Sequence, residues 1–263
     1  MDKITSSQNP KIRQVMQLAK SWERKEKQLF VIEGFREISL ALRAGYCAEM
    51  ILLCPGKSHP GILSDILSKV DEALCYEITP ALFEKIAYRE NSDGVLMVAR
   101  ARWLRPESIR LSENPFVIVL EAIEKPGNLG AVLRTADAAG VDAVMVCDPQ
   151  TDLFNPNAIR SGIGCLFTNQ VVCCTSEEAY QYLKKSGISI YAAELKASRW
   201  YHEVNFSKPS AIVMGTEADG LTSFWLNQAD ERIKIPMKGC IDSLNVSVST
   251  AVLTFEAMRQ RGF

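Results

Sequence analysis

Short apolar runs, rich in β-branched and aliphatic residues and bounded by Gly, Pro or polar residues, recur along the whole chain. Such runs predict strands. They cover residues 29–33, 49–54, 73–78, 94–99, 116–120, 142–147, 170–173, 188–193, 210–214 and 231–235. Most segments between them have helical periodicity, including a basic amphipathic helix expected over 11–27. Strands that alternate with helices indicate an α/β fold, and the second half favours a parallel sheet with helices on both faces.

A polar, aperiodic stretch with two prolines, residues 106–115, interrupts this pattern and predicts a linker. We therefore expect a first, small α/β domain over 1–105 and a second over 116–263. A chain of 263 residues is long enough for both. The composition, 47% hydrophobic and 23% charged, predicts folded cores throughout.

No apolar run is long enough to span a bilayer, and the N-terminus lacks an apolar signal segment, so we expect a cytoplasmic protein without a membrane partner. The eight cysteines form no Cys-x-x-Cys pair and are interpreted as small buried hydrophobic residues. Cys240 is the exception because it lies in a polar loop. With only His59 and His202 in the chain, we expect neither a metal site nor a Cys-His couple.

The net charge of −1 is unevenly distributed. Residues 1–45 hold nine Lys or Arg against five Asp or Glu, an excess of +4, so the remainder carries −5. A basic end suits a module that contacts nucleic-acid phosphates. A solvated helix face with ion pairs such as Glu23–Lys27 would give the same excess. Charge alone leaves both interpretations open.

Three segments of the second domain each place a polar loop after an apolar strand. They are FVIVLEAIEKPGNLGAVLRTADAAGVDAVMV (116–146), AIVMGTEADGL (211–221) and IPMKGCIDSLNVSVSTAVLTFE (235–256). In doubly wound sheets, ligands bind outside the carboxyl ends of the strands, where these loops would lie. The third loop leads into a helix for which Ser243 or Asn245 can be the N-cap.

In this order the segments resemble the three motifs of the SpoU (TrmH) class of RNA ribose 2′-O-methyltransferases, a branch of the SPOUT superfamily. The motif positions are Asn128 and Arg134, then Gly215, Glu217 and Gly220, then Ser243 and Asn245 behind Ile235-Pro236. The resemblance implies a trefoil-knotted catalytic domain, a homodimer, and methyl transfer from S-adenosylmethionine to a 2′-hydroxyl of RNA without a metal.

The opening, ITSSQNPKIRQ followed by LFVIEGFREI, resembles the substrate-binding domain of many SpoU enzymes, a small α/β fold akin to ribosomal RNA-binding proteins. It implies that the basic excess is an RNA-docking surface. The candidate RNA contacts are Lys11, Arg13, Arg24, Lys25 and Arg36, together with Arg160 between the first and second motifs.

The resemblance also assigns roles. Arg134 is expected to bind the adjacent phosphate and stabilise the developing alkoxide, since a guanidinium that stays charged is a poor base. Asn128 and Asn245 would fix substrate geometry, Glu217 would order Arg134, and Ser243 would contact the hydroxyl or phosphate. The structural alternatives are caps, a first-turn glutamate and an Arg134–Asp137 pair. The implied cofactor pocket consists of Leu195, Gly215, Thr216, Ile235, Met237 and Leu244.

The two-domain organisation of the chain favours ribosomal RNA over transfer RNA as the substrate. The alternatives are a tRNA 2′-O-methyltransferase, a catalytically silent RNA-binding protein of the same fold, and a nucleotide-dependent oxidoreductase. The last would require Gly-x-Gly-x-x-Gly after the first strand of the second domain, and PGNLGAVLRTA does not supply it.

Overall fold

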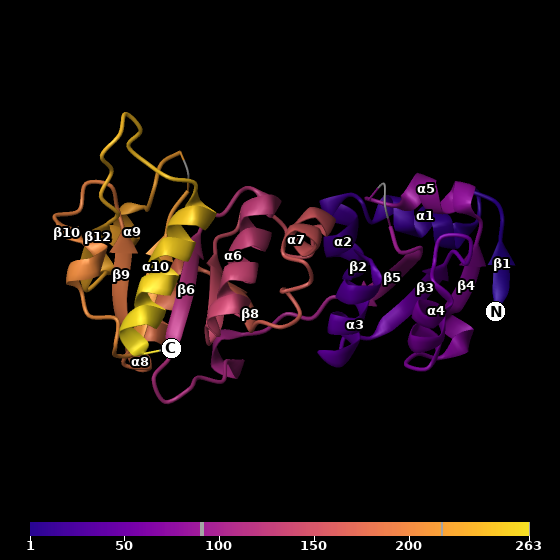
Figure 1. The fold of residues 1–263 in the computed structure, drawn as a ribbon, viewed down its shortest axis with the longest axis horizontal. Helices are drawn as coiled ribbons and strands as arrows, with labels where there is room; N and C mark the ends of the chain where they lie inside the picture. Colours follow the sequence, from indigo (N-terminus) through magenta and orange to yellow (C-terminus); the bar gives the residue numbers. More distant parts are fainter. Residues whose placement is uncertain (90–91, 217, 263) are drawn as a thin grey trace. The chain divides into compact units, whose positions relative to one another are not determined.

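The computed structural model describes residues 1–89, 92–216 and 218–262. The chain forms two compact units, and each has its own sheet (Figure 1). The first unit combines residues 1–102 with 152–168, and the second combines 103–151 with 169–263. The segment 152–168 therefore belongs to the first unit although residues of the second unit flank it on both sides.

The first unit has a mixed five-stranded sheet in the order β1-β4-β3-β5-β2. β5 is antiparallel to β2 and β3, and the other pairs are parallel. The strands are β1 (Asp2–Ile4), β2 (Leu29–Glu33), β3 (Ala48–Leu53), β4 (Cys75–Ile78) and β5 (Val95–Arg100). The helices are α1 (Pro10–Gln17), α2 (Ser21–Lys27), α3 (Phe35–Arg43), α4 (Pro60–Leu67), α5 (Pro80–Ile86) and α7 (Pro156–Ser161).

The single helix predicted over 11–27 is wrong, because the segment forms two helices, α1 and α2. The break lies at Lys20, whose backbone is extended. Leu18 just before the break is fully buried in the same core as Ile12 and Val15 of α1. The expected Glu23–Lys27 pair is present at 2.8 Å within α2. The turn therefore ends α1, which buries Ile12 and Val15, before α2 begins.

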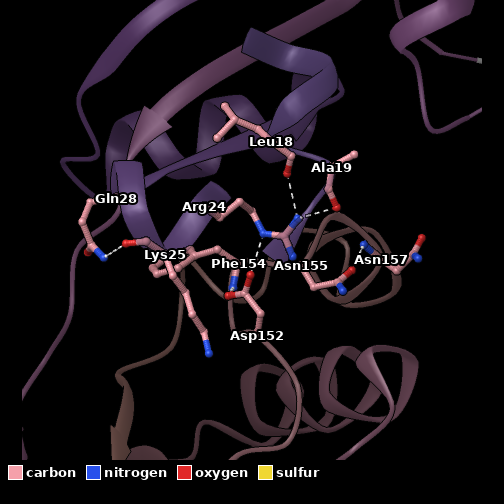
Figure 2. Close-up of polar contacts among 9 residues, drawn as sticks. All are labelled: Leu18, Ala19, Arg24, Lys25, Gln28, Asp152, Phe154, Asn155 and Asn157. Atoms are coloured by element: carbon pink, nitrogen blue, oxygen red, sulfur yellow. Dashed lines mark hydrogen bonds and ion pairs between the residues drawn. The ribbon is translucent and has the colours of Figure 1, made fainter. Parts of the chain in front are cut away.

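A buried ion pair joins α2 to the segment 152–168 (Figure 2). Arg24 Nε lies 2.5 Å from Asp152 Oδ2, and the two side chains are only 4% and 5% exposed. The Arg24 guanidinium also donates to the carbonyl oxygens of Leu18 and Ala19 at 2.7 and 2.9 Å. Because both charged side chains are shielded from water, each needs the opposite charge of the other to offset the cost of burial.

An aromatic cluster joins the same segment to β2. The Phe154 ring packs on Phe30 in a tilted arrangement with centroids 4.4 Å apart, and the Phe167 ring stacks on Phe30 with centroids 6.3 Å apart. Gly164 has φ +84°, and a Cβ there would approach Leu40 Cδ1 to 2.9 Å. The backbone of the segment thus packs directly against α3, which explains why it folds with the first unit.

The second unit has a seven-stranded sheet in the order β10-β12-β9-β11-β6-β7-β8, and its pairs are parallel. The strands are β6 (Phe116–Glu121), β7 (Ala143–Cys147), β8 (Val171–Cys174), β9 (Ser189–Ala193), β10 (Arg199–Trp200), β11 (Ser210–Met214) and β12 (Glu231–Lys234). The helices are α6 (Pro126–Ala139), α8 (Ser176–Lys185), α9 (Ser223–Gln228) and α10 (Val246–Arg261). The predicted α/β class is confirmed, with a mixed sheet first and a parallel sheet second.

Alternate residues of the interior strand β6 face opposite sides of this sheet. Val117 and Val119 share a core with the α8 residue Leu183 and the α9 residue Trp225. Helices α6 and α10 pack against each other and against the other face (Figure 1). Both faces are therefore covered, as expected for a parallel sheet. A knot in the path of the chain stays a prediction.

The stretch predicted as a linker packs within the second unit. Within it, Ile109 is part of the core of the parallel sheet, and Leu104, just before it, bridges to Val172 of β8. The Gln170 side chain accepts the Arg110 N–H at 2.9 Å and donates to the Arg110 carbonyl oxygen at 2.8 Å. This stretch lies along the edge strand instead of crossing solvent.

We predict that Arg24→Ala will lower the free energy of unfolding by about 3 kcal/mol, because it leaves the buried Asp152 carboxylate unpaired. Lys25→Ala, at the exposed neighbouring position, is the matched control and should change stability little. Chemical denaturation of both variants measures the difference. Equal stability of the two variants would contradict a stabilising role for the buried pair.

Candidate active site

A cavity of about 360 Å³ opens at the carboxyl edge of the second sheet, beyond the ends of β9, β11 and β12. Its lining includes strand-end residues and the loops of the second and third motifs. All six residues predicted to hold a cofactor line it, namely Leu195, Gly215, Thr216, Ile235, Met237 and Leu244. Ser243 from the third motif lines it as well. The structure thus gathers in one cavity predicted residues that are up to 49 positions apart in the sequence, from Leu195 to Leu244.

The loop after β11 is closed by its own backbone. Thr216 and Gly220 exchange two backbone hydrogen bonds, at 3.0 and 3.2 Å, and Thr216 Oγ1 accepts the Asp219 N–H at 3.0 Å. A Cβ on Gly215 would overlap the carbonyl group of Gly220. Only glycine permits this close approach, which is the physical reason for Gly215 at this position of the motif.

The first and third motifs meet at two asparagines. Asn245 Nδ2 lies 3.3 Å from Asn128 Oδ1. As predicted, an asparagine of this loop is the N-cap of α10, since Asn245 Oδ1 accepts the Ser247 N–H at 3.0 Å. Asn128 also borders a small hollow with Gly215 and Thr216. The three motif loops are therefore in contact at one edge of the sheet. The exposed Ser243, by contrast, donates to Asp242 at 3.2 Å and caps no helix.

Arg134 is not part of the cavity lining. It lies on α6 with its side chain exposed, whereas the neighbouring Leu133 is fully buried. Arg134 is six positions after Asn128, which places the two on different sides of the helix. Arg134 is thus accessible from solvent and set apart from the asparagine pair. Glu217, expected to order it, lies outside the described residues.

The candidate RNA contacts of the first unit differ in exposure. Arg13, Lys25, Arg36 and Arg160 are exposed, and Lys11 is half-buried with its Nζ 4.2 Å from the centre of the Tyr76 ring. Arg13 donates to Gln8, and Arg160 donates to the Tyr88 carbonyl at 3.2 Å.

Arg24 departs from the expectation of an exposed RNA contact. Its guanidinium is buried and donates to Asp152, Leu18 and Ala19. Its position in a basic cluster of the sequence suggested a phosphate contact. Because its guanidinium is shielded from water and paired with the buried Asp152 carboxylate, Arg24 has a structural role in the folded chain.

The three sequence motifs do not include the charged residues at the strand ends. Glu194 follows β9, Lys234 ends β12, and both line the cavity with Lys196 and Asp219. The rim therefore carries charges of both signs. The rule that ligands bind at the carboxyl ends of parallel strands could have identified them.

Four of the eight cysteines are buried and Cys173 and Cys174 are partly buried. Cys240, the predicted exception, is exposed, and so is Cys47, for which burial was expected. The hydrogen bond that the Cys147 thiol donates to Cys174, together with burial, raises the pKa of Cys147 far above its usual value, so Cys147 stays protonated. Within residues 1–89, 92–216 and 218–262, no three His, Cys, Asp or Glu side chains are grouped to hold a metal. None of the described helices is long and apolar enough to cross a bilayer.

Comparisons with known proteins agree with this geometry. The chain is 31% identical to the 23S rRNA (guanosine(2553)-2′-O)-methyltransferase RlmP of Bacillus subtilis, over 97% of this chain and 98% of that one. It is 39% identical to a tRNA (guanosine(18)-2′-O)-methyltransferase of Thermus thermophilus, over 59% of this chain and 80% of that one. The crystal structure of an AdoMet-bound rRNA methyltransferase from Sinorhizobium meliloti superimposes with a TM-score of 0.89 at 27% identity, covering 98% and 97% of the two chains.

Two protein-family models match successive parts of the sequence. Residues 9–97 match the MRM3-like substrate binding domain, and residues 115–255 match the SpoU rRNA methylase family. The second match spans more than half of the chain and contains all three motif loops. The chain therefore belongs to the SpoU rRNA methylase family.

Proposed function

We propose that this protein transfers a methyl group from S-adenosylmethionine to a ribose 2′-hydroxyl of RNA. The observation that carries the proposal is the cavity at the carboxyl edge of the second sheet, where Asn245 of the third motif also contacts Asn128 of the first. Its apolar lining suits an adenine ring, and the charges of both signs at its rim suit a zwitterionic amino-acid group.

The chain's own residues supply alignment and electrostatic stabilisation. When bound, the cofactor supplies a methyl group already activated on a sulfonium. Gly215 allows the loop backbone to close on itself, which fixes the cavity wall. Asn128 and Asn245 can hold the ribose by donating and accepting hydrogen bonds. The exposed Arg134 can bind a phosphate and stabilise negative charge on the 2′-oxygen as its proton leaves.

Ribosomal RNA is the substrate class we propose. The similarity to the rRNA enzyme extends over both units, whereas the similarity to the tRNA enzyme covers 59% of this chain. The exposed basic residues of the first unit, Arg13, Lys25, Arg36 and Arg160, are the RNA contacts we propose there. We place the reaction in the cytoplasm. Transfer RNA is the alternative substrate.

A homodimer is the assembly we propose, through the outer face of α10. Val248 and Phe255 on this helix are 48% and 40% exposed, while Leu253 and Ala257 face the core. Exposed large apolar side chains on one helix are typical of a buried contact in an assembly.

We predict that Arg134→Ala will lower kcat for RNA methylation by about a hundredfold, because charge stabilisation in the transition state is lost. The cofactor Kd should not change, since Arg134 lies outside the cavity. Transfer of label from methyl-labelled cofactor to unmodified ribosomal RNA measures the rate of methylation. Digestion of the product locates the label and so identifies the class of reaction. Arg110→Ala, at another exposed arginine of this unit, is the control. Wild-type protein that binds the cofactor but methylates neither rRNA nor tRNA would favour a silent RNA-binding protein.

We predict that Gly215→Ala will weaken cofactor binding at least about tenfold and lower the Tm, because the added methyl group forces Gly220 away. Gly239→Ala in the third loop is the matched control, since its Cβ would meet no atom within 4 Å. Calorimetric titration with S-adenosylmethionine compares the two. Wild-type affinity in Gly215→Ala would place the cofactor elsewhere.

We predict that the double substitution Val248→Asp with Phe255→Asp will convert a dimer into a monomer, because two charges would be buried in the contact. Met16→Asp, at a residue 50% exposed in the first unit, should leave the assembly intact. Sedimentation velocity distinguishes the two masses. A dimer that persists in the double variant would rule out this face.

A further inference from the structure

Glu121 is a buried carboxylate that no step above uses. It is the last residue of β6, and only 4% of it is exposed. Its Oε2 accepts the backbone N–H of Thr222 at 2.8 Å, and its Oε1 accepts the Thr222 hydroxyl at 2.6 Å. Burying a carboxylate is costly unless donors surround it. Here one residue, distant in the sequence, provides two of them.

Thr222 directly follows the loop that walls the cavity. Gly215, Thr216, Gly220 and Leu221 of this loop all line the cavity. One end of the loop is fixed where Met214 pairs with Leu120, next to Glu121. The other end is held by the Glu121–Thr222 bonds. The end of β6 therefore determines where both ends of the loop lie.

A second set of hydrogen bonds continues from Glu121 away from the loop. Ser176 Oγ lies 3.5 Å from Glu121 Oε1, donates to Asp148 Oδ2 at 2.7 Å and accepts from Trp225 Nε1 at 3.1 Å. The network thus has one part that reaches the loop through Thr222 and another that reaches α8 and α9 through Ser176. These two parts can be altered separately.

We propose that Glu121 is a positioning residue for the cofactor site. Resting on the proposed function, the inference is that the Glu121 carboxylate holds Gly220 and Leu221 in the position that receives S-adenosylmethionine. Hydrogen bonds to an ionised group are the stronger kind, and two of them on one residue fix both its backbone and its side chain. The loop is then preorganised, and binding does not have to order it.

The test replaces Glu121 with Gln, which keeps the shape but removes the charge and one acceptor. The Kd and the KM for S-adenosylmethionine should rise about tenfold or more, the size expected when a hydrogen bond to a charged group is lost. The kcat at saturating cofactor should stay close to the wild-type value, because Glu121 is absent from the cavity lining. Titration calorimetry and steady-state kinetics measure these quantities.

Two further variants separate positioning from general stability. Ser176→Ala removes the hydroxyl contacts to Asp148, Trp225 and Glu121 but leaves both Thr222 contacts, so its Tm should fall while its cofactor Kd stays unchanged. Thr222→Val removes only the hydroxyl donor, so its Kd should rise less than in Glu121→Gln. The double variant Glu121→Gln with Thr222→Val should bind no more weakly than Glu121→Gln, because the two residues act as one unit.

Wild-type cofactor affinity in Glu121→Gln, with a Tm lowered as in Ser176→Ala, would overturn the proposal. If Glu121→Gln does not fold, Thr222→Val decides, and an unchanged Kd in that variant would overturn it equally. Failure of the wild-type protein itself to bind S-adenosylmethionine would remove the proposed function and this inference together. That result is recognised from the wild type alone.

Discussion

Parallel hydrogen bonding between β6 and β11 is the interaction on which the candidate site depends. The register from Phe116–Ser210 to Leu120–Met214 brings the ends of the two strands side by side. The loops that follow them then begin at the same edge, within reach of the loop after β12. Parallel strands need long crossover connections, so residues far apart in the sequence meet where the strands end.

Two buried carboxylates stabilise segments that are remote in sequence, one in each unit. Asp152 pairs with Arg24 and ties its own segment to α2, whereas Glu121 anchors Thr222 at the end of the cavity wall. In both cases the cost of desolvating a charge is offset by several donors. Glu121 lies within the first motif segment but is not one of its named positions, so the framework of the cavity wall extends beyond those positions.

Regular elements and local caps followed from the sequence because their signals are local. The strands after which the motif loops occur and the Asn245 cap need only alternation, length and a side chain that accepts a nearby N–H. The break at Lys20 did not follow, since basic residues favour helix on either side of it and only core packing by α1 decides where the helix ends. Residues 152–168 belong to the first unit because they contact Phe30 and Arg24. No local sequence pattern predicts these contacts.

The fold class, the order of the three motif loops and the side chains they offer can all be predicted from the sequence. These properties depend on periodicity and on residue type. Which polar residues share an environment depends on tertiary packing. It buried Arg24 against Asp152, left Arg134 outside the cavity, and placed Glu121 beneath Thr222, 101 residues away. Burial and contact arise from the packing of distant segments, and that packing decides whether a charged side chain is a surface contact or part of the framework.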